Sequence, residues 1–170
     1  MKKILAVAVA LGLFALAAGP ALAGTDTTTF QVTANVVPSC KFTAATAMNF
    51  GSLDVSKAQA GTPIAAQNTI SVLCTAGGSY SIDLNYGANP DPSNNRRMSD
   101  GASHYLGYDI FLDAAATERW ASGSGSHQAF SGDGLVDSFT AYGQLPWNVS
   151  LLPASPVGSY IDTVTATVNY

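Results

Sequence analysis

The chain has 170 residues, 7 of them basic and 11 acidic, which gives a formal net charge of −4 at pH 7. Such an acidic protein repels nucleic acid, because binding to the phosphate backbone depends on Lys and Arg contacts. The length suits a single domain with one core, and the small share of charged residues, 11%, together with many Thr, Ser, Ala, Gly, Asn, Val and Tyr, favours strands and turns over helices.

The N-terminal residues have the pattern of a cleavable signal peptide. Lys2 and Lys3 precede an apolar run from residue 4 to residue 18, and Ala21-Leu22-Ala23 forms an A-x-A cleavage site. The run is shorter than the roughly 20 apolar residues that cross a bilayer, and no later stretch is long enough to do so. We therefore expect export, cleavage after Ala23 and no membrane-spanning segment. The mature part would keep 147 residues and a formal charge of −6.

The first predicted strand precedes the first cysteine. Phe30, Val32, Ala34 and Val36 alternate with polar residues, and Val37-Pro38 ends the pattern. This period of two is typical of a strand with one apolar face. Further short strands are predicted at residues 48–55, 69–75, 80–86, 105–113, 138–145 and 160–170.

The segments between these strands are rich in turn residues. Residues 87–101 contain Asn89-Pro90-Asp91-Pro92 and can hold neither a helix nor an inner strand. Residues 121–134 are rich in Gly and Ser, and residues 113–120 predict a turn or a short 3₁₀ segment. The spacing of the strands, without an internal repeat, predicts an antiparallel β-sandwich.

The only cysteines of the chain are Cys40 and Cys74. Thiols of exported proteins are normally oxidised, and two cysteines allow one pairing. We therefore predict a disulfide between them.

The last predicted strand has an apolar face and a free outer edge. Val164, Ala166, Val168 and Tyr170 face one way, and the strand runs to the end of the sequence, so that no later segment pairs with it. Residues 30–36, in contrast, follow a polar leader and look like an extra strand that the sheet of their own subunit does not need. The two features together favour donor-strand complementation, in which an extended segment completes the sheet of another subunit.

An ordinary edge strand within one subunit is the alternative for residues 30–36. A parallel position beside the chain's own last strand needs a crossover of a dozen or more residues. Only Val37, Pro38 and Ser39 lie between the predicted strand and Cys40. This short connection favours exchange between subunits, although it permits a simple bend.

Several motifs together resemble the spore coat protein U domain family, which includes subunits of archaic chaperone/usher pili. The likeness covers residues 29–170. Besides the alternating segment before Cys40, its marks are Met48-Asn49-Phe50-Gly51, Ile70-Ser71-Val72-Leu73-Cys74, Leu84-Asn85-Tyr86-Gly87, Leu106-Gly107-Tyr108-Asp109, Tyr142-Gly143-Gln144-Leu145-Pro146 and the ending from Gly158 to Tyr170.

This resemblance implies an all-β, incomplete immunoglobulin-like antiparallel sandwich. Its parts would be a signal peptide (1–23), a leader with the donor strand (24–37) and a sandwich domain (38–170). The implied partners are further copies or related pilins, a periplasmic chaperone and an outer-membrane usher. The implied location is the periplasm in transit and then a fimbrium on the cell surface or outside the cell, where the fibre would support adhesion or biofilm formation.

No residue pattern predicts an enzyme, a cofactor or a metal site. His104 and His127 are isolated, and Ser124 and Ser126 beside His127 lie in a Gly/Ser loop without the strand-to-helix turn of a hydrolase. Asp91, Asp100 and Asp113 fall in or beside turns, where Asp bonds to local backbone amides. The spacing of the acidic residues in 87–101 is not that of an EF-hand, although a hard cation there stays an alternative.

Two further readings concern the surface. Arg96-Arg97 is interpreted as a solvated loop tip. Trp120 and Trp147 either stack on sugars or fill the core. A soluble secreted or coat-associated lectin-like module is therefore the alternative to a fibre subunit.

Overall fold

The computed structural model describes residues 23–58, 61–122, 129–147, 150 and 155–170. The predicted signal peptide, apart from Ala23, lies outside the described residues, as do Ser124, Ser126 and His127. The chain divides into two units, residues 1–35 and residues 36–170. Within the described ranges, no helix has the length and apolar character needed to span a membrane.

Residues 23–35 of the first unit form neither a strand nor a helix. Phe30 and Val32 are 84% and 85% exposed, and none of the described ladders includes this segment. The alternating pattern therefore does not produce a strand at residues 30–36 in this structure. The physical reason is that an extended segment becomes a strand only when a neighbour takes up its backbone hydrogen bonds.

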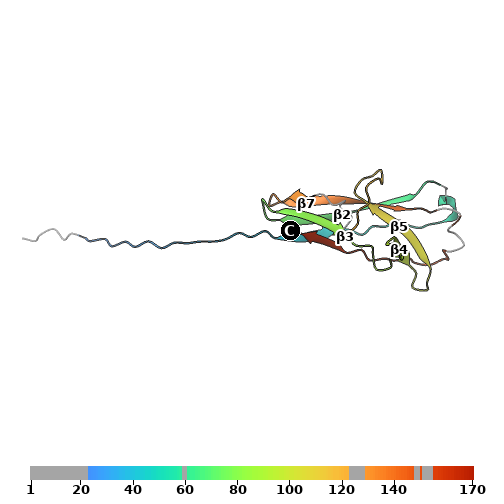
Figure 1. The fold of residues 1–170 in the computed structure, drawn as a ribbon, viewed down its shortest axis with the longest axis horizontal. Coiled ribbons are helices and arrows are strands. Elements are labelled where there is room, and N and C mark those ends of the chain that lie inside the picture. The colour runs from blue at the N-terminus through green and yellow to red at the C-terminus, as the bar shows by residue number, and fades with distance from the viewer. Residues whose placement is uncertain (1–22, 59–60, 123–128, 148–149, 151–154) are drawn as a thin grey trace, which may run out of the picture. The chain divides into compact units, whose positions relative to one another are not determined.

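The second unit consists of two antiparallel sheets, as the sequence predicted (Figure 1). The five-stranded sheet has the order β1 (Cys40–Ala45), β2 (Ile64–Cys74), β7 (Val136–Leu145), β5 (Tyr105–Phe111) and β4 (Arg96–Ser99). The three-stranded sheet has the order β6 (Phe130–Ser131), β3 (Ser79–Leu84) and β8 (Ala166–Asn169).

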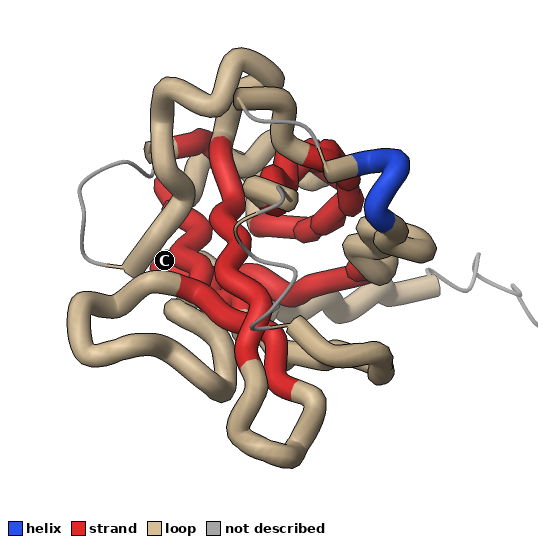
Figure 2. The backbone as a smooth tube through the Cα atoms, turned by 90° about the vertical axis from the view of Figure 1, so that its right-hand side faces the viewer, coloured by secondary structure: helices blue, strands red, loops and turns tan. Residues whose placement is uncertain are grey.

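The strand predicted at residues 48–55 is wrong. Residues 48–55 contain no strand, and the chain instead makes a single turn of 3₁₀ helix, η1 (Val55–Lys57), drawn in blue in Figure 2. Met48 and Phe50 pack against Gly143 of β7 so closely that a side chain at 143 would collide with both. The apolar residues of this segment thus enter the space between the sheets without joining a ladder.

The core lies between the two sheets and is built from alternate residues of the long strands. Ile70 and Val72 of β2, Ile82 of β3 and Ile110 of β5 are almost completely buried. Trp120 and Trp147 also fill the core: the indole of Trp120 donates to the carbonyl oxygen of Ile82 at 2.8 Å, and that of Trp147 to Asp54 at 2.9 Å. Neither tryptophan is thus available to stack on a sugar.

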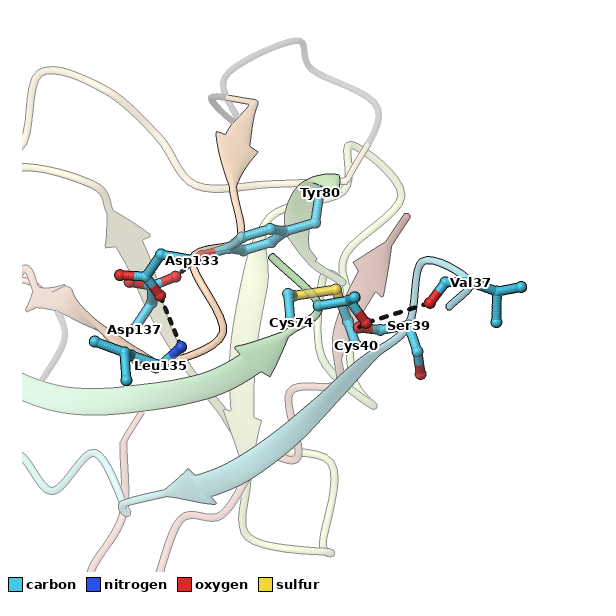
Figure 3. Close-up of a disulfide and its surroundings, with 9 residues drawn as sticks. Val37, Ser39, Cys40, Cys74, Tyr80, Asp133, Leu135 and Asp137 are labelled. Atoms are coloured by element: carbon cyan, nitrogen blue, oxygen red, sulfur yellow. Dashed lines mark hydrogen bonds between the residues drawn. A yellow bond between two sulfur atoms is a disulfide. The ribbon is translucent and has the colours of Figure 1, made fainter. Parts of the chain in front are cut away.

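The predicted disulfide is present and joins the first residue of β1 to the last residue of β2 (Figure 3). Cys40 and Cys74 are directly opposed in the antiparallel pair. The ladder continues beyond them, because the amide of Thr75 donates to the carbonyl oxygen of Ser39 at 2.9 Å. The covalent bond therefore fixes the register of an edge strand at its beginning.

Arg96 is not at a solvated loop tip, and that prediction is wrong. Its side chain is fully buried, and its guanidinium donates to the carbonyl oxygens of Leu84, Asn85 and Trp120 and forms an ion pair with Asp109 at 2.8 Å. Burial lowers the pKa of Arg96, and the attraction of Asp109 opposes that shift. One side chain thus ties β4 to β3, β5 and the chain at Trp120.

Loss of the disulfide is expected to destabilise the domain. Closing a loop of about 35 residues restricts the unfolded chain, which corresponds to roughly 3 to 4 kcal/mol in the loop-entropy model. Urea unfolding of the mature chain, followed by the fluorescence of the two buried tryptophans, should show this loss for the double variant Cys40→Ser, Cys74→Ser. An unchanged midpoint would contradict the prediction.

Arg96→Leu is expected to cost about 3 to 5 kcal/mol of unfolding free energy, because it leaves buried carbonyl oxygens and part of the Asp109 carboxylate without their donor. Arg97→Leu is the matched control. Arg97 stacks on the ring of Tyr105 at 4.1 Å and bonds to Asn89 and Pro90 at a partly exposed position, so its loss should cost about 1 kcal/mol or less. Equal effects of the two substitutions in urea unfolding would contradict the burial argument.

Candidate functional site

The two sheets leave two strand edges facing an unfilled space. In the part of the chain that the structure describes, β1 pairs with β2 on one side only, and β8 pairs with β3 on one side only. Backbone N–H and C=O groups on an unpaired edge are a template for a further strand. The candidate functional site is therefore the space between β1 and β8.

A groove of about 560 Å³ occupies this space. Its floor is the inner face of both sheets and includes Ile70, Ile110 and Leu84. One wall follows β1 and the residues after it, with Phe42, Ala45, Met48 and Phe50. The other wall follows the C-terminal segment, with Tyr160, Asp162, Val164 and Ala166.

The β1 wall is partly open to solvent. Phe42 is 37% exposed, although it points towards the apolar interior. The pairing with β2 is irregular between Phe42 and Ala44, where Thr43 has no partner of its own. An extra residue of this kind bends a strand, and the chain after β1 continues to Met48 and Phe50 in the same wall of the groove.

The opposite wall keeps the alternation that the sequence predicted. Asp162, Val164 and Ala166 are partly buried, and the threonines between and beyond them are exposed. Of the predicted acceptor-edge residues, Val164 and Ala166 line the groove, Val168 packs on the core outside it, and Tyr170 is 63% exposed. The predicted donor residues Phe30, Val32 and Val36 are exposed.

A carboxylate fixes the C-terminal segment at the groove. Asp162 accepts hydrogen bonds from the hydroxyl of Tyr108 at 2.7 Å, from the amide of Ala88 at 2.8 Å and from the side-chain amide of Asn89 at 3.3 Å. Gly87 lies so close to this carboxylate that a Cβ atom at 87 would overlap with it. The carboxylate thus connects the last segment to β5 and to the loop after β3.

Two neighbouring contacts hold the same segment in place. The backbone of Ile161 exchanges two hydrogen bonds with Ser99 at the end of β4, both at 2.9 Å. The side chain of Asn85 accepts from the amide of Thr165 at 2.8 Å, immediately before β8. The C-terminal wall is therefore attached to both sheets within the single chain, without a strand bound at its outer edge.

Two buried tyrosines donate to carboxylates, and their pKa values are raised. For Tyr108, burial is the largest cause, followed by the hydrogen bond to Asp162 and the charge of that carboxylate. For Tyr80, burial again comes first, and the bond to Asp137 at 2.6 Å adds to it. Figure 3 shows Tyr80 and Asp137 close to the disulfide. Both phenols are therefore neutral donors over the physiological pH range.

The other acidic residues singled out in the sequence serve local turns. Asp91 accepts from the amides of Ser93 and Asn95, and Asp113 from those of Thr117 and Glu118. Asp100 accepts from the amide of His104 and contacts its ring at 2.6 Å. Over the described ranges, no three or more His, Cys, Asp or Glu side chains gather in a way that could hold a metal ion.

The groove has the chemistry that suits an extended peptide. Its interior is mainly apolar, and strand edges border it on both sides, so that a β-strand placed between them gains backbone hydrogen bonds while its alternate side chains enter the floor. The predicted acceptor-edge residues Val164 and Ala166 lie in this lining, and their role stays a prediction. The sequence patterns did not single out Asp162, Tyr108 and Phe42 as site residues, although Tyr108 lies in the motif Leu106-Gly107-Tyr108-Asp109 and Asp162 in the ending from Gly158 to Tyr170.

Comparisons with known proteins agree with this architecture. A family model described as Spore Coat Protein U domain matches residues 26–167. One similar solved structure is a chain of the chaperone–tip adhesion subunit pre-assembly complex of the archaic chaperone-usher Csu pili of Acinetobacter baumannii, with a TM-score of 0.56 and 24% identity. The match covers 79% of this chain and 40% of that chain.

A second similar structure is the P pilus rod subunit PapA, with a TM-score of 0.54 and 12% identity, over 77% of this chain and 98% of that chain. At these identities, the likeness to the two solved structures establishes a shared fold. A comparison with curated proteins finds no match.

The raised pKa of Tyr108 predicts a loss of stability at alkaline pH. The phenol keeps its proton in the folded protein, whereas in the unfolded chain it loses it near pH 10. Unfolding therefore releases a proton above that pH, and stability is full below about pH 10 and falls as the pH rises further, by up to about 1.4 kcal/mol per pH unit for this group. Tyr80 acts in the same direction.

Tyr108→Phe should flatten this slope and also lower stability at pH 7 by about 1 to 2 kcal/mol, because Asp162 loses one donor. Urea unfolding at several values between about pH 8 and 11 measures both effects. A variant with the wild-type slope would show that Tyr108 does not contribute to it.

Proposed function

Because the chain belongs to the Spore Coat Protein U domain family, we propose that it is a structural subunit of an extracellular pilus or fimbria, assembled by the chaperone/usher route, that supports adhesion or biofilm formation. The observation that carries the proposal is the groove between the free edges of β1 and β8. An apolar groove between two open strand edges is the vacancy that donor-strand exchange fills. The role is structural and not catalytic.

The segment that fills the vacancy is the N-terminal segment 24–37 of another copy or of a related pilin. Its apolar residues Phe30, Val32 and Val36 are exposed in the single chain. Burying one such side chain contributes about 1.5 to 3 kcal/mol by area, as an upper value before the segment is ordered. Together with backbone bonds to both edges, this makes a durable joint between subunits.

Exchange between copies is favoured by the contacts at the end of this segment, where it leads into β1. The hydroxyl of Thr75 lies 3.4 Å from the carbonyl oxygen of Val37 and 3.2 Å from that of Ser39, and the amide of Thr75 donates to Ser39. These bonds extend the direction of β1 back through residues 37–39, which form no turn. A hairpin that returned the segment to its own groove would need a reversal at this point.

An open groove also requires protection before assembly, because exposed edges and apolar floor residues aggregate. One similar structure is a complex of a chaperone with a tip adhesion subunit. We therefore include a periplasmic chaperone as the first occupant of the groove and an outer-membrane usher as the site of exchange. The chain is accordingly exported, passes through the periplasm and ends at the cell surface.

A lectin-like module is the second candidate, and one observation favours it. A separate hollow of about 480 Å³ is lined by Phe111 together with the polar side chains of Asn95 and Gln144. An aromatic ring beside amide groups is suited to bind a sugar. This module would remain a soluble monomer and would not need the groove between β1 and β8.

Val32→Asp is expected to abolish polymers of the mature chain, because a charge cannot enter the apolar groove without a partner. The readout is denaturing gel electrophoresis of unheated and boiled samples, in which strand-exchanged wild-type polymers give a ladder that collapses on boiling. The matched control is Thr33→Asp, which places the same charge on the outward face of the same segment and should leave the ladder intact.

The folding of both variants is checked by the fluorescence of Trp120 and Trp147 and by the oxidised state of the two cysteines. A wild-type chain that runs as a monomer in both lanes would support the lectin-like module. Normal polymers from Val32→Asp would overturn the assignment of residues 30–36 as the donor strand.

A further inference from the structure

We propose that Asp133-Gly134, in the connection from β6 to β7, is a site of spontaneous backbone modification, at which aspartate converts to isoaspartate. The chain contains two Asp-Gly pairs, Asp100-Gly101 and Asp133-Gly134. Their covalent chemistry is the same, but the fold holds the reacting groups of the first pair and leaves those of the second pair with few restraints. The inference goes beyond the proposed function and does not depend on strand exchange.

The reaction needs only the aspartate side chain, the next backbone amide and water. The amide nitrogen of the glycine loses its proton and bonds to the carboxyl carbon Cγ, and one water molecule leaves, which gives a five-membered succinimide ring. A water molecule then opens the ring. Opening at the backbone carbonyl carbon leaves a main chain that runs through Cβ and Cγ, with no net change of mass or oxidation state. Glycine favours ring closure, because it has no Cβ atom that hinders the amide.

Both reacting groups of Asp100-Gly101 are held by hydrogen bonds. The amide of Gly101, which is the nucleophile of the reaction, donates to the hydroxyl of Ser99 at 3.0 Å. The carboxylate of Asp100 accepts from the amides of Ala102 at 2.7 Å and His104 at 3.1 Å. Its second oxygen contacts the ring of His104 at 2.6 Å. Ring closure at this pair therefore requires several bonds to break.

Asp133-Gly134 lacks most of these restraints. Its carboxylate accepts a hydrogen bond from the amide of Leu135 at 2.8 Å, drawn as a dashed line in Figure 3. Among the residues that the structure describes, the amide of Gly134 donates to no group. Both residues of the pair are exposed, and a Cβ atom at 134 would meet only the side chain of Ala76, at 3.8 Å. The nucleophile is thus free, and water reaches the site.

The modification would change the backbone beside the disulfide. Gly134 lines a hollow next to Cys40 and Cys74. The nearby Gly132 lies so close to Cys74 and Thr75 that a Cβ atom at 132 would overlap with both. One extra main-chain atom at residue 133 therefore has to be absorbed towards the start of β7. The groove between β1 and β8 is not lined by this pair.

The first test follows isoaspartate at both pairs in the oxidised mature chain, stored at neutral pH and physiological temperature. Electron-transfer fragmentation in a mass spectrometer identifies isoaspartate at each position. The reduced, urea-unfolded chain is the control, because both pairs are free in it. Folding should slow the reaction at Asp100 at least about tenfold more than at Asp133, since broken hydrogen bonds add to the barrier. Equal slowing at the two pairs, or stronger slowing at Asp133, would overturn the inference.

The second test releases the protected pair. The double variant Ser99→Ala, His104→Ala removes the acceptor of the Gly101 amide and the ring beside the Asp100 carboxylate, so the rate at Asp100 should rise at least about tenfold. The rate at Asp133 should stay as in the wild type and serves as the internal control, and tryptophan fluorescence checks the fold. An unchanged rate at Asp100 would contradict the protection by these bonds and overturn the proposal.

Discussion

The organisation of this protein depends on two strands that each lack a neighbour. β1 and β8 are edges of different sheets, and between them the apolar interior of the sandwich is open over about 560 Å³. A closed sandwich would cover these residues with a further strand. Here Phe42, Ile70 and Ile110 instead line the opening. The free edges and the apolar floor together form this vacancy in a domain that belongs to the Spore Coat Protein U domain family, and we propose that the exposed N-terminal segment of another copy fills it.

Much of the sandwich could be predicted from local patterns. β2, β3, β5 and β7 have one apolar face against the core, and a period of two identifies such strands without any knowledge of their neighbours. The same logic fails for β1, where a residue without a partner interrupts the alternation after Phe42 and Phe42 itself is 37% exposed. It also fails at residues 48–55, because Met48 and Phe50 are apolar for packing against Gly143 and not for pairing in a ladder.

The site was harder to predict, since it depends on contacts between distant residues. Val164 and Ala166 could be assigned to a wall because they alternate with threonines. Asp162 has no such signal: its partners Tyr108 and Ala88 are far away in the sequence, and an isolated aspartate normally indicates a turn or a solvated surface. The solvated position predicted for Arg96 is wrong for the same reason. A buried guanidinium is recognisable only when the carbonyl groups that surround it are known.

The position of the disulfide determines how a pulling force on the N-terminal segment would enter the domain. Tension applied at Val37 reaches Cys40 after three peptide bonds, and the sulfur atoms then transmit it to Cys74 in β2, a strand held between β1 and β7. The tension therefore does not pass along the hydrogen-bonded ladder of β1 or through the 33 residues between the two cysteines. Mechanical load would therefore be borne by an inner strand with hydrogen bonds on both sides, and peeling of the edge strand would not relieve it.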